Sequence, residues 1–224
     1  MKRKFSYVMW LTILFLSASI ISARTFYQQQ SVRIIIVPSE DIKTIQEAVN
    51  NASEGDIIQV IPLETPYYEN VTVNKAVTIM RFPDAQGYPV VDGGNRKGTV
   101  FDIVSSGVRI NGFIIENGEY GIRVRGNNSI ISNVTVISNV NGIILDGAYN
   151  CTLQDCNMNS NTRNFGVKGI SLNDFIHRID TSNKINGKPV YYWINHDNEQ
   201  VPTNAGYVAI INSTDIIVEK LSLE

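Results

Sequence analysis

Apolar side chains recur at a fixed spacing along the middle of the chain. Three columns step by 21 and then 22 positions: Ile110, Ile131 and Leu153; Phe113, Val134 and Cys156; Ile115, Val136 and Met158. Within each pass the second and third columns lie two residues apart, which is the period of a strand and not of a helix. The spacing recurs at Ile176, Ile179 and Thr181 and, after an interruption, at Val218, Leu221 and Leu223. The pattern therefore predicts five passes in one register.

A period just above 20 residues, with short β-rich units between Gly and Asn, is typical of a solenoid. The candidates are a parallel β-helix and a leucine-rich repeat, and the Leu and helix content of the second is missing. We therefore predict an all-β fold, a single-stranded right-handed parallel β-helix whose coils stack like residues into internal columns. Gly and Asn tolerate left-handed backbone at sharp corners, which are expected at Gly121, Gly126, Asn127, Asn128, Gly142 and Gly147.

A short helix is expected over residues 41–52, ahead of the repeat. Its apolar face would consist of Ile45, Ala48, Val49 and Ala52, with Ser39 or Asp41 as the N-cap. Such a helix would cover the first coil, because the end of a solenoid otherwise leaves its core open. Strands are expected at 57–61, 71–73 and 77–80 and at Val90 and Val91, within one β-helix domain spanning residues 37–224.

Residues 1–23 have the pattern of a secretory signal peptide. Lys2, Arg3 and Lys4 precede an apolar run over residues 5–21 that leads into small residues. An uncleaved N-terminal membrane anchor is the alternative, because a run of about 17 residues is at the lower limit for crossing a bilayer. Without residues 1–23 the chain has 16 basic and 21 acidic residues. This negative charge argues against nucleic acid as a partner, and the predicted location is secreted or at the cell surface.

Two further features fit an exported protein, but each has a simpler interpretation. Asn-x-Ser/Thr sequons occur at Asn51, Asn70, Asn127, Asn133, Asn150 and Asn212. They are glycosylation candidates, although an Asn- and Thr-rich solenoid produces such triplets by composition alone. Cys151 and Cys156 could form a disulfide. A buried small hydrophobic residue is favoured for Cys156, because it occupies a core column.

The order TIQEAVNNASEGDIIQV, YYENVTVNKAVTI and VVDGG, followed by Asn-rich coils, resembles exported proteins of the pectin lyase-like fold. It resembles in particular the NosD-like proteins common on archaeal cell surfaces. The resemblance runs from about Val37 to the last residue and includes the stretch NGKPVYYWINHDNEQVPTNAGYVAIINSTDIIVEKL. It implies a right-handed β-helix, but the same fold carries lyases, hydrolases, adhesins and surface-layer modules.

Catalysis and metal binding find little support in the sequence. A polysaccharide lyase or glycoside hydrolase needs converging carboxylates, whereas Glu116, Glu119, Asp146 and Asp155 are expected at corners or pointing outward, with no second acid in the same column. The NosD-like resemblance implies copper delivery, which needs clustered soft ligands. His177 and His196 are far apart and Cys156 and Met158 fall in core columns, so no metal or cofactor is predicted.

An inserted loop is expected at residues 187–206, where the repeat is interrupted by about one coil. Aromatic faces beside carboxylates suit sugar rings, so the candidate ligand-binding residues are Tyr192, Trp193, His196, Asp197 and Glu199. In the competing interpretation Val190 and Tyr192 are strand residues and Trp193 covers the edge of the core.

The predicted function is therefore that of an exported cell-surface β-helix module, structural or carbohydrate-contacting, without catalysis. The expected partner is a polysaccharide or a surface-layer component; the alternatives are a lyase or hydrolase and a copper-delivery accessory protein. Residues 216–218 and 221–223 are expected to form ladder strands with no cap after them. This open end predicts either a fragment of a longer solenoid or end-to-end association through the C-terminal coil.

Overall fold

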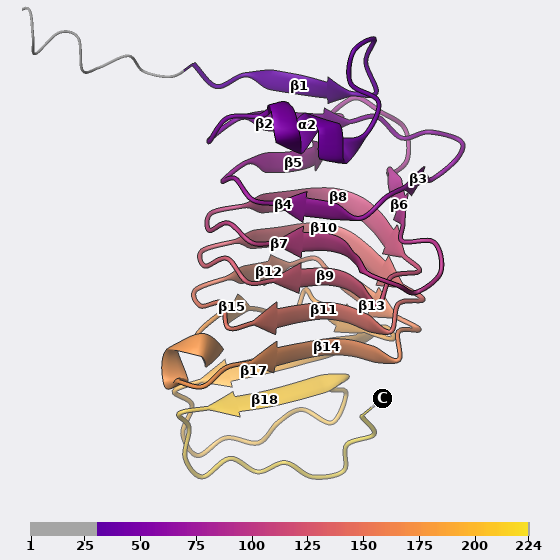
Figure 1. The fold of residues 1–224 in the computed structure, drawn as a ribbon. Helices are drawn as coiled ribbons and strands as arrows, with labels where there is room; N and C mark the ends of the chain where they lie inside the picture. Colours follow the sequence, from indigo (N-terminus) through magenta and orange to yellow (C-terminus); the bar gives the residue numbers. More distant parts are fainter. Residues whose placement is uncertain (1–30, 224) are drawn as a thin grey trace, which may run out of the picture. The chain divides into compact units, whose positions relative to one another are not determined.

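The computed structural model describes residues 31–223, so the predicted signal peptide at residues 1–23 lies outside them. Residues 33–223 form one compact unit, whose regular elements are nearly all short strands (Figure 1). Within the described residues, no helix has the length and apolar character needed to cross a membrane. The elements are β1 (Ile34–Val37), α2 (Ile45–Asn51), β2 (Ile57–Val60), β3 (Tyr67–Tyr68), β4 (Val71–Val73), β5 (Thr78–Arg81), β6 (Val90–Asp92), β7 (Thr99–Ile103), β8 (Arg109–Glu116), β9 (Tyr120–Val124), β10 (Ile130–Ile137), β11 (Asn141–Asp146), β12 (Thr152–Gln154), β13 (Asn157–Asn159), β14 (Arg163–Lys168), the 3-10 helix η1 (Leu172–Phe175), β15 (Arg178–Ile179), β16 (Lys184–Ile185), β17 (Lys188–Ile194) and β18 (Tyr207–Ile211).

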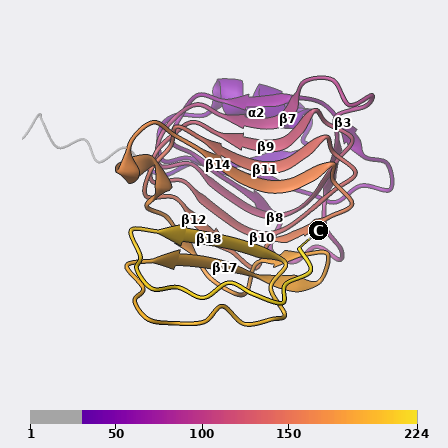
Figure 2. The ribbon, with the colours of Figure 1, turned by 90° about the horizontal axis from the view of Figure 1, so that it is seen from below.

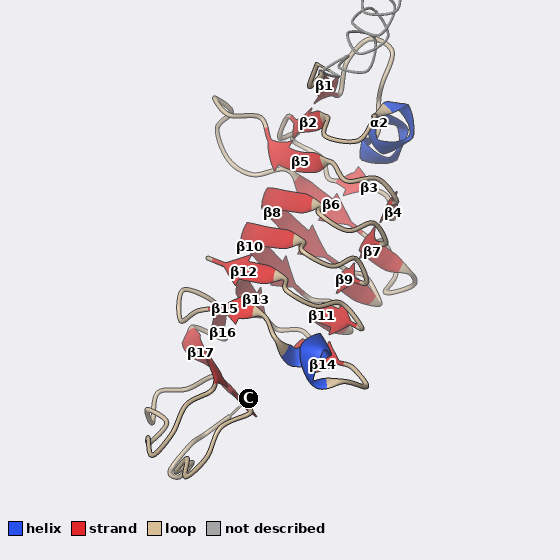
Figure 3. Cartoon of the chain, turned by 90° about the vertical axis from the view of Figure 1, so that its left-hand side faces the viewer, coloured by secondary structure: helices blue, strands red, loops and turns tan. Residues whose placement is uncertain are grey.

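The strands stack coil upon coil into the predicted parallel β-helix. One sheet follows the order β1-β2-β5-β8-β10-β13-β16-β17-β18, with β3, β6, β12 and β15 pairing beside this path. A second sheet has the order β14-β11-β9-β7-β4. Seen from the side, the two sheets run along the same stack, with α2 at one end (Figure 3). Pairing between successive coils is parallel, and the consecutive strands β7 to β11 alternate between the two sheets.

The three apolar columns of the sequence form the core between the sheets. Ile131 pairs with Ile110 and with Leu153, and Val136 pairs with Ile115 and with Met158. All nine residues of the three predicted columns are at most 1% exposed. The ring of Phe113 packs edge-on against Phe101 of the second sheet, with centroids 5.5 Å apart. The predicted coil register is therefore confirmed for the central coils.

The predicted register is wrong for the fourth and fifth passes. Ile179, not Ile176, pairs with Leu153, and Ile185 pairs with Met158. The shift arises because η1 lies within this coil and lengthens it. At the C-terminus, residues 216–223 form no strand, and Val218 and Leu223 are 46% and 52% exposed. The expected ladder strands are therefore absent.

Left-handed residues occur at the corners and stack in columns, as predicted, but only some of them are the residues that the sequence indicated. One corner column comprises Gly112, Asn133 and Asp155, with φ of 81°, 52° and 53°. Of the six residues expected at such corners, Asn128 and Gly147 have positive φ. Gly126 and Gly142 serve close packing instead, because an added Cβ would lie 1.8 Å from Ser105 O and 2.2 Å from Asn164 O, respectively.

Helix α2 covers the first coil but is shorter than the predicted 41–52. Its N-cap is Thr44, which forms a capping box with Glu47, and not the expected Ser39 or Asp41. The predicted apolar face is buried: Ile45, Ala48, Val49 and Ala52 are at most 5% exposed. Seven residues are too few for a stable isolated helix, so α2 depends on its contacts with the coils.

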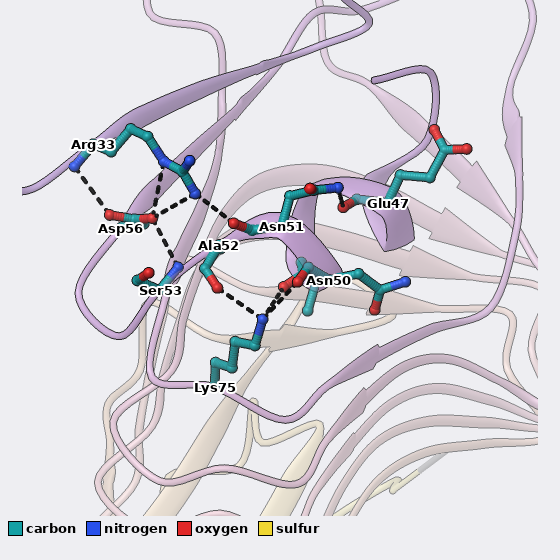
Figure 4. Close-up of polar contacts among 9 residues, drawn as sticks. Arg33, Glu47, Asn50, Asn51, Ala52, Ser53, Asp56 and Lys75 are labelled. Carbon is teal, nitrogen blue, oxygen red and sulfur yellow. Dashed lines mark hydrogen bonds and ion pairs between the residues drawn. The ribbon is translucent and has the colours of Figure 1, made fainter. Parts of the chain in front are cut away.

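Side chains from the first coils hold both ends of α2. The Glu69 carboxylate accepts hydrogen bonds from the backbone N–H of Ile45 (3.0 Å) and Gln46 (2.9 Å). At the other end, Lys75 Nζ donates to the carbonyls of Val49 (3.0 Å), Asn50 (2.7 Å) and Ala52 (2.7 Å), as Figure 4 shows for the last two. The carboxylate thus meets the positive end of the helix dipole and the ammonium the negative end.

The segment expected as an inserted loop, residues 187–206, begins with strand β17 and forms the first of two shorter coils. Strand β16 pairs with β17 in an antiparallel hairpin, so the chain reverses direction there. Val190 then pairs with Tyr207, 17 residues later, in parallel register along β17 and β18. Figure 2 shows these two strands at the near end of the stack. The chain therefore changes from coils of 21 or more residues to coils of 17.

Candidate functional site

Strand β17 presents alternate side chains to the core and to solvent. Val190 is fully buried and Tyr192 is 8% exposed. Tyr192 OH donates to the carbonyl of Phe175 (2.7 Å), and burial raises the pKa of its phenol. The structure therefore places Tyr192 in the core, as the strand interpretation of Val190 and Tyr192 predicts, and not with the other candidate ligand residues.

The opposite face of β17 carries two partly exposed rings, Tyr191 and Trp193, and a third, His196, follows two residues after the strand ends; we call these three rings the aromatic patch. The Trp193 and His196 rings stack with centroids 4.6 Å apart and an angle of 5°. Tyr191 lies edge-on to Trp193 at 6.2 Å and 86°. Three ring planes in fixed relation make a preformed apolar surface beside solvent.

Polar neighbours hold the rings of the patch in place. His196 Nδ1 lies 2.9 Å from Glu199 Oε1, and Tyr191 OH donates to Asn204 Oδ1 at 3.0 Å. Thr214 Oγ1 donates to Asp197 Oδ1, which ties the first short coil to the second. Three of the candidate residues, Trp193, His196 and Glu199, are thus in direct contact, with Asp197 next to His196 in sequence.

Strand β18 extends the patch. Val208 pairs with Tyr191 and Ile210 pairs with Trp193, so both lie on the same face of the strand pair. Ile210 is 38% exposed. Sequence reasoning missed the part played by Tyr191, although its position two residues before Trp193 indicates the same strand face.

A pair of carboxylates was also missed. Asp92 of β6 lies directly beside Glu116 of β8 in the parallel register, so the expectation that no acid has a second acid in its column is wrong. Asp92 is 9% exposed and accepts hydrogen bonds from Gly94 N (2.7 Å) and Asn117 Nδ2 (3.0 Å). Burial raises the pKa of Glu116, and the neighbouring Asp92 raises it further. The coil spacing here is 24 residues, which hides the pair from a 21-residue alignment.

The remaining candidate acids have structural partners or point to solvent. Asp146 pairs with Arg123, whose guanidinium lies 5.4 Å from the centre of the Tyr120 ring. Asp155 is exposed on a left-handed corner. A pocket of about 440 Å³ adjoins Asp146 and is lined also by Gly147, Lys168, Gly169, Ile170 and Asp174. The Asp174 carboxylate accepts hydrogen bonds from the backbone N–H groups of Ile170 and Ser171 at the start of η1.

The sulfur and imidazole groups in the core serve packing. Cys151, Cys156 and Met158 are fully buried, and both cysteines are free. Burial raises the pKa of Cys156 to about 12, so it remains a thiol. His177 Nδ1 accepts from Cys151 N (3.3 Å), and burial lowers the pKa of this imidazole. Across residues 31–223, no three His, Cys, Asp or Glu side chains are grouped as metal ligands.

The sequons lie on turns and coil surfaces. Asn127 is partly buried, and the other five candidates are exposed: Asn51, Asn70, Asn133, Asn150 and Asn212. Some of these amides are used within the fold; Asn150 Nδ2, for example, donates to Asn128 Oδ1 at 2.7 Å. Glycosylation at any of them stays a prediction.

Comparison with known proteins supports the fold. No family model matches the sequence, and no curated protein matches it. The structure is similar to that of the pectate lyase Pel9A, with a TM-score of 0.53 and 15% identity over 84% of this chain and 56% of the lyase. The chain thus spans little more than half of that enzyme's length, and at this identity the likeness shows the β-helix fold alone.

Two weaker likenesses are to enzymes with other activities. A rhamnogalacturonan lyase gives a TM-score of 0.45 at 13% identity, covering 84% of this chain and 54% of the lyase. The pectin methylesterase of Aspergillus niger gives 0.40 at 11% identity, covering 86% of this chain and 87% of the esterase. Neither likeness supports an inference about chemistry.

Proposed function

We propose that this protein is a β-helix module that binds carbohydrate through the aromatic patch and does not catalyse its cleavage. The observation that carries the proposal is the stack of Trp193, on the outer face of β17, with His196, just past the end of that strand. Pyranose rings present C–H surfaces that pack on aromatic faces, while their hydroxyl groups need polar partners such as Glu199 and Asn204.

The cellular setting belongs to the same proposal. The basic and apolar pattern of residues 1–23 supports export or anchoring, and the resemblance to NosD-like proteins supports a place at an archaeal cell surface. A polysaccharide or surface-layer component is the proposed partner. End-to-end association through the C-terminal coil also stays a prediction, now centred on β18, which is the last strand of the described sheet.

Tryptophan fluorescence tests the binding proposal directly. The chain has two tryptophans, Trp10 and Trp193, so the full chain with Trp10→Phe reports on Trp193 alone. Titration with neutral, amino and acidic oligosaccharides should change the Trp193 emission for at least one class. Tyr191→Ala should weaken that response, whereas Tyr68→Ala, at a 69% exposed tyrosine of β3, should not. No emission change with any class would refute carbohydrate binding at this patch.

A lyase or hydrolase remains the second candidate, because Asp92 and Glu116 are neighbours and the Glu116 pKa is raised. A carboxyl group whose pKa is raised by burial and by a neighbouring carboxylate is an arrangement that acid–base catalysis uses. Its test is product release from polygalacturonate and neutral glycans, with and without Ca²⁺. Glu116→Gln should abolish any turnover while Glu119→Gln preserves it. Absence of turnover in the unmodified chain would reject this candidate.

A further inference from the structure

We infer that the aromatic patch recognises a glycan built from amino sugars with free, protonated amines. This inference rests on the proposed function and names the ligand class of the same site. It is drawn from three features of the terminal segment: the carboxylates near the rings, the net charge of the segment, and the partly exposed rings themselves.

Carboxylates border the rings. The Glu199 side chain is 49% exposed and contacts His196 through Oε1. Asp197 is exposed and accepts the Thr214 hydroxyl through Oδ1. A carboxylate has about four acceptor positions, so each group retains capacity for a further donor after these contacts. An ammonium held over the rings would find an acceptor in Glu199, which contacts His196.

The segment around the aromatic patch carries a net negative charge, as the carboxylates near the rings do. Residues 188–223 contain four carboxylates, at Asp197, Glu199, Asp215 and Glu219, and two lysines, at Lys188 and Lys220. Lys188 Nζ donates to the carbonyl of Ser222 (3.0 Å), and Lys220 Nζ pairs with Glu219 at 3.1 Å. The segment is therefore net negative, and both ammonium groups have partners within the protein. A uronate at the patch would meet like charge.

Aromatic faces add a second attraction for a cation. An ammonium within about 6 Å of the face of a tryptophan or tyrosine is attracted by the ring quadrupole, and tryptophan is the stronger partner. Trp193 and Tyr191 lie close together on one strand face, so one pyranose can stack while the amine of its neighbour lies over the second ring. Rings and carboxylates together provide the chemistry that recognises organic ammonium groups.

Basic side chains gather elsewhere on the unit. Arg123 and Arg125 project from β9 and its end, and each forms an ion pair with an aspartate on a neighbouring strand. Arg163 and Lys168, at the ends of β14, are exposed on the same sheet. The five-stranded sheet thus carries groups that would suit an acidic polymer.

The test compares three oligosaccharides of equal length on the full chain with Trp10→Phe, at a pH where the sugar amine is protonated. They are glucosamine oligomers, their N-acetylated counterparts, which are neutral, and oligogalacturonates. We expect the glucosamine oligomers to bind about fivefold tighter than the neutral ones, which is the effect of one close charge pair in water. The advantage should shrink at high salt, and oligogalacturonates should bind most weakly.

Variants assign the preference to particular groups. Glu199→Gln keeps an acceptor for His196 and removes the charge, so it should abolish most of the advantage of the free amine. Glu64→Gln, on the exposed loop between β2 and β3, makes the same change in net charge far along the chain and should leave the advantage intact. Equal or reversed preference for oligogalacturonates, or an advantage that survives Glu199→Gln, would overturn the ligand class while leaving carbohydrate binding in place. A chain that binds none of the three sugars would overturn the proposed function as well.

Discussion

Replacing Lys75 by methionine tests the claim that side chains of the coils, and not helix propensity, hold the N-terminal cap in place. Lys75 Nζ donates to three carbonyls at the C-terminal end of α2, at 3.0, 2.7 and 2.7 Å. Methionine keeps the apolar stem and removes only the ammonium. The change therefore isolates the polar contacts at this end of the helix.

The expected loss follows from these contacts. A hydrogen bond to a charged group contributes about 1.5–3 kcal/mol when it is shielded. Lys75 is partly buried and water replaces part of what is removed, so the three bonds together should contribute about 2–3 kcal/mol. The helix dipole acts in the same direction. This free energy corresponds to a roughly 30- to 150-fold larger population of the locally opened state of α2.

Hydrogen exchange of the α2 amides measures that opening, with Ala48 N and Ala52 N as probes because both donate within the helix and its cap. Urea unfolding of the same variant should show a lower midpoint. Lys97→Met, at an exposed lysine, is the control and should change stability by less than about 0.5 kcal/mol. Unchanged exchange at both amides in Lys75→Met would refute the view that this lysine holds the cap.

Three further predictions concern the coils. Val134→Asp should cost several kcal/mol and lower the melting temperature, because it buries an unpaired charge at a position 1% exposed, whereas Ser132→Asp on the outward face should be nearly neutral; equal melting temperatures would contradict the register. Gly126→Ala should unfold its coil, because the new Cβ would lie 1.8 Å from a carbonyl oxygen. Gly147→Ala, at φ +74 with open space around the new Cβ, should cost only about 1 kcal/mol in a urea titration. A smaller loss of stability for Gly126→Ala than for Gly147→Ala would contradict this prediction. Burial lowers the pKa of His177 below its value in the unfolded chain, so the stability that the neutral imidazole contributes is present above about pH 6.5 and is lost as the pH falls. His177→Gln should reduce the slope of the urea midpoint against pH in this range. An unchanged slope would contradict the prediction.

The sequence predicts the fold where the coil length is constant. Phe113, Val134 and Cys156 align because successive coils there have 21 and 22 residues, so a single period identifies the inward faces. The prediction fails where coil length changes. Asp92 and Glu116 are 24 residues apart, and the coil containing η1 moves Ile179 into the first column. Turns that vary in length change the register without changing the apolar period within each strand.

The sequence predicts that several of the candidate ligand-binding residues lie close together, but not which of them face solvent. Trp193, His196 and Glu199 do come together, whereas Tyr192 faces the core and Tyr191 takes its place on the surface. The alternation of strand faces relates Tyr191 to Trp193 from sequence alone. Which of the two faces is buried depends on the reversal of the chain between β16 and β17. A short hairpin of this kind interrupts the 21-residue repeat, so the repeat does not predict which residues after it face the core.

The measurement that tests the account most directly is a crystal structure of the chain with a saturating glucosamine oligomer. The account predicts a pyranose ring stacked on Trp193, with its amine within hydrogen-bond distance of Glu199. Sugar bound instead over Asp92 and Glu116, or along the outer face of β9, β11 and β14, with the aromatic patch empty, would contradict it.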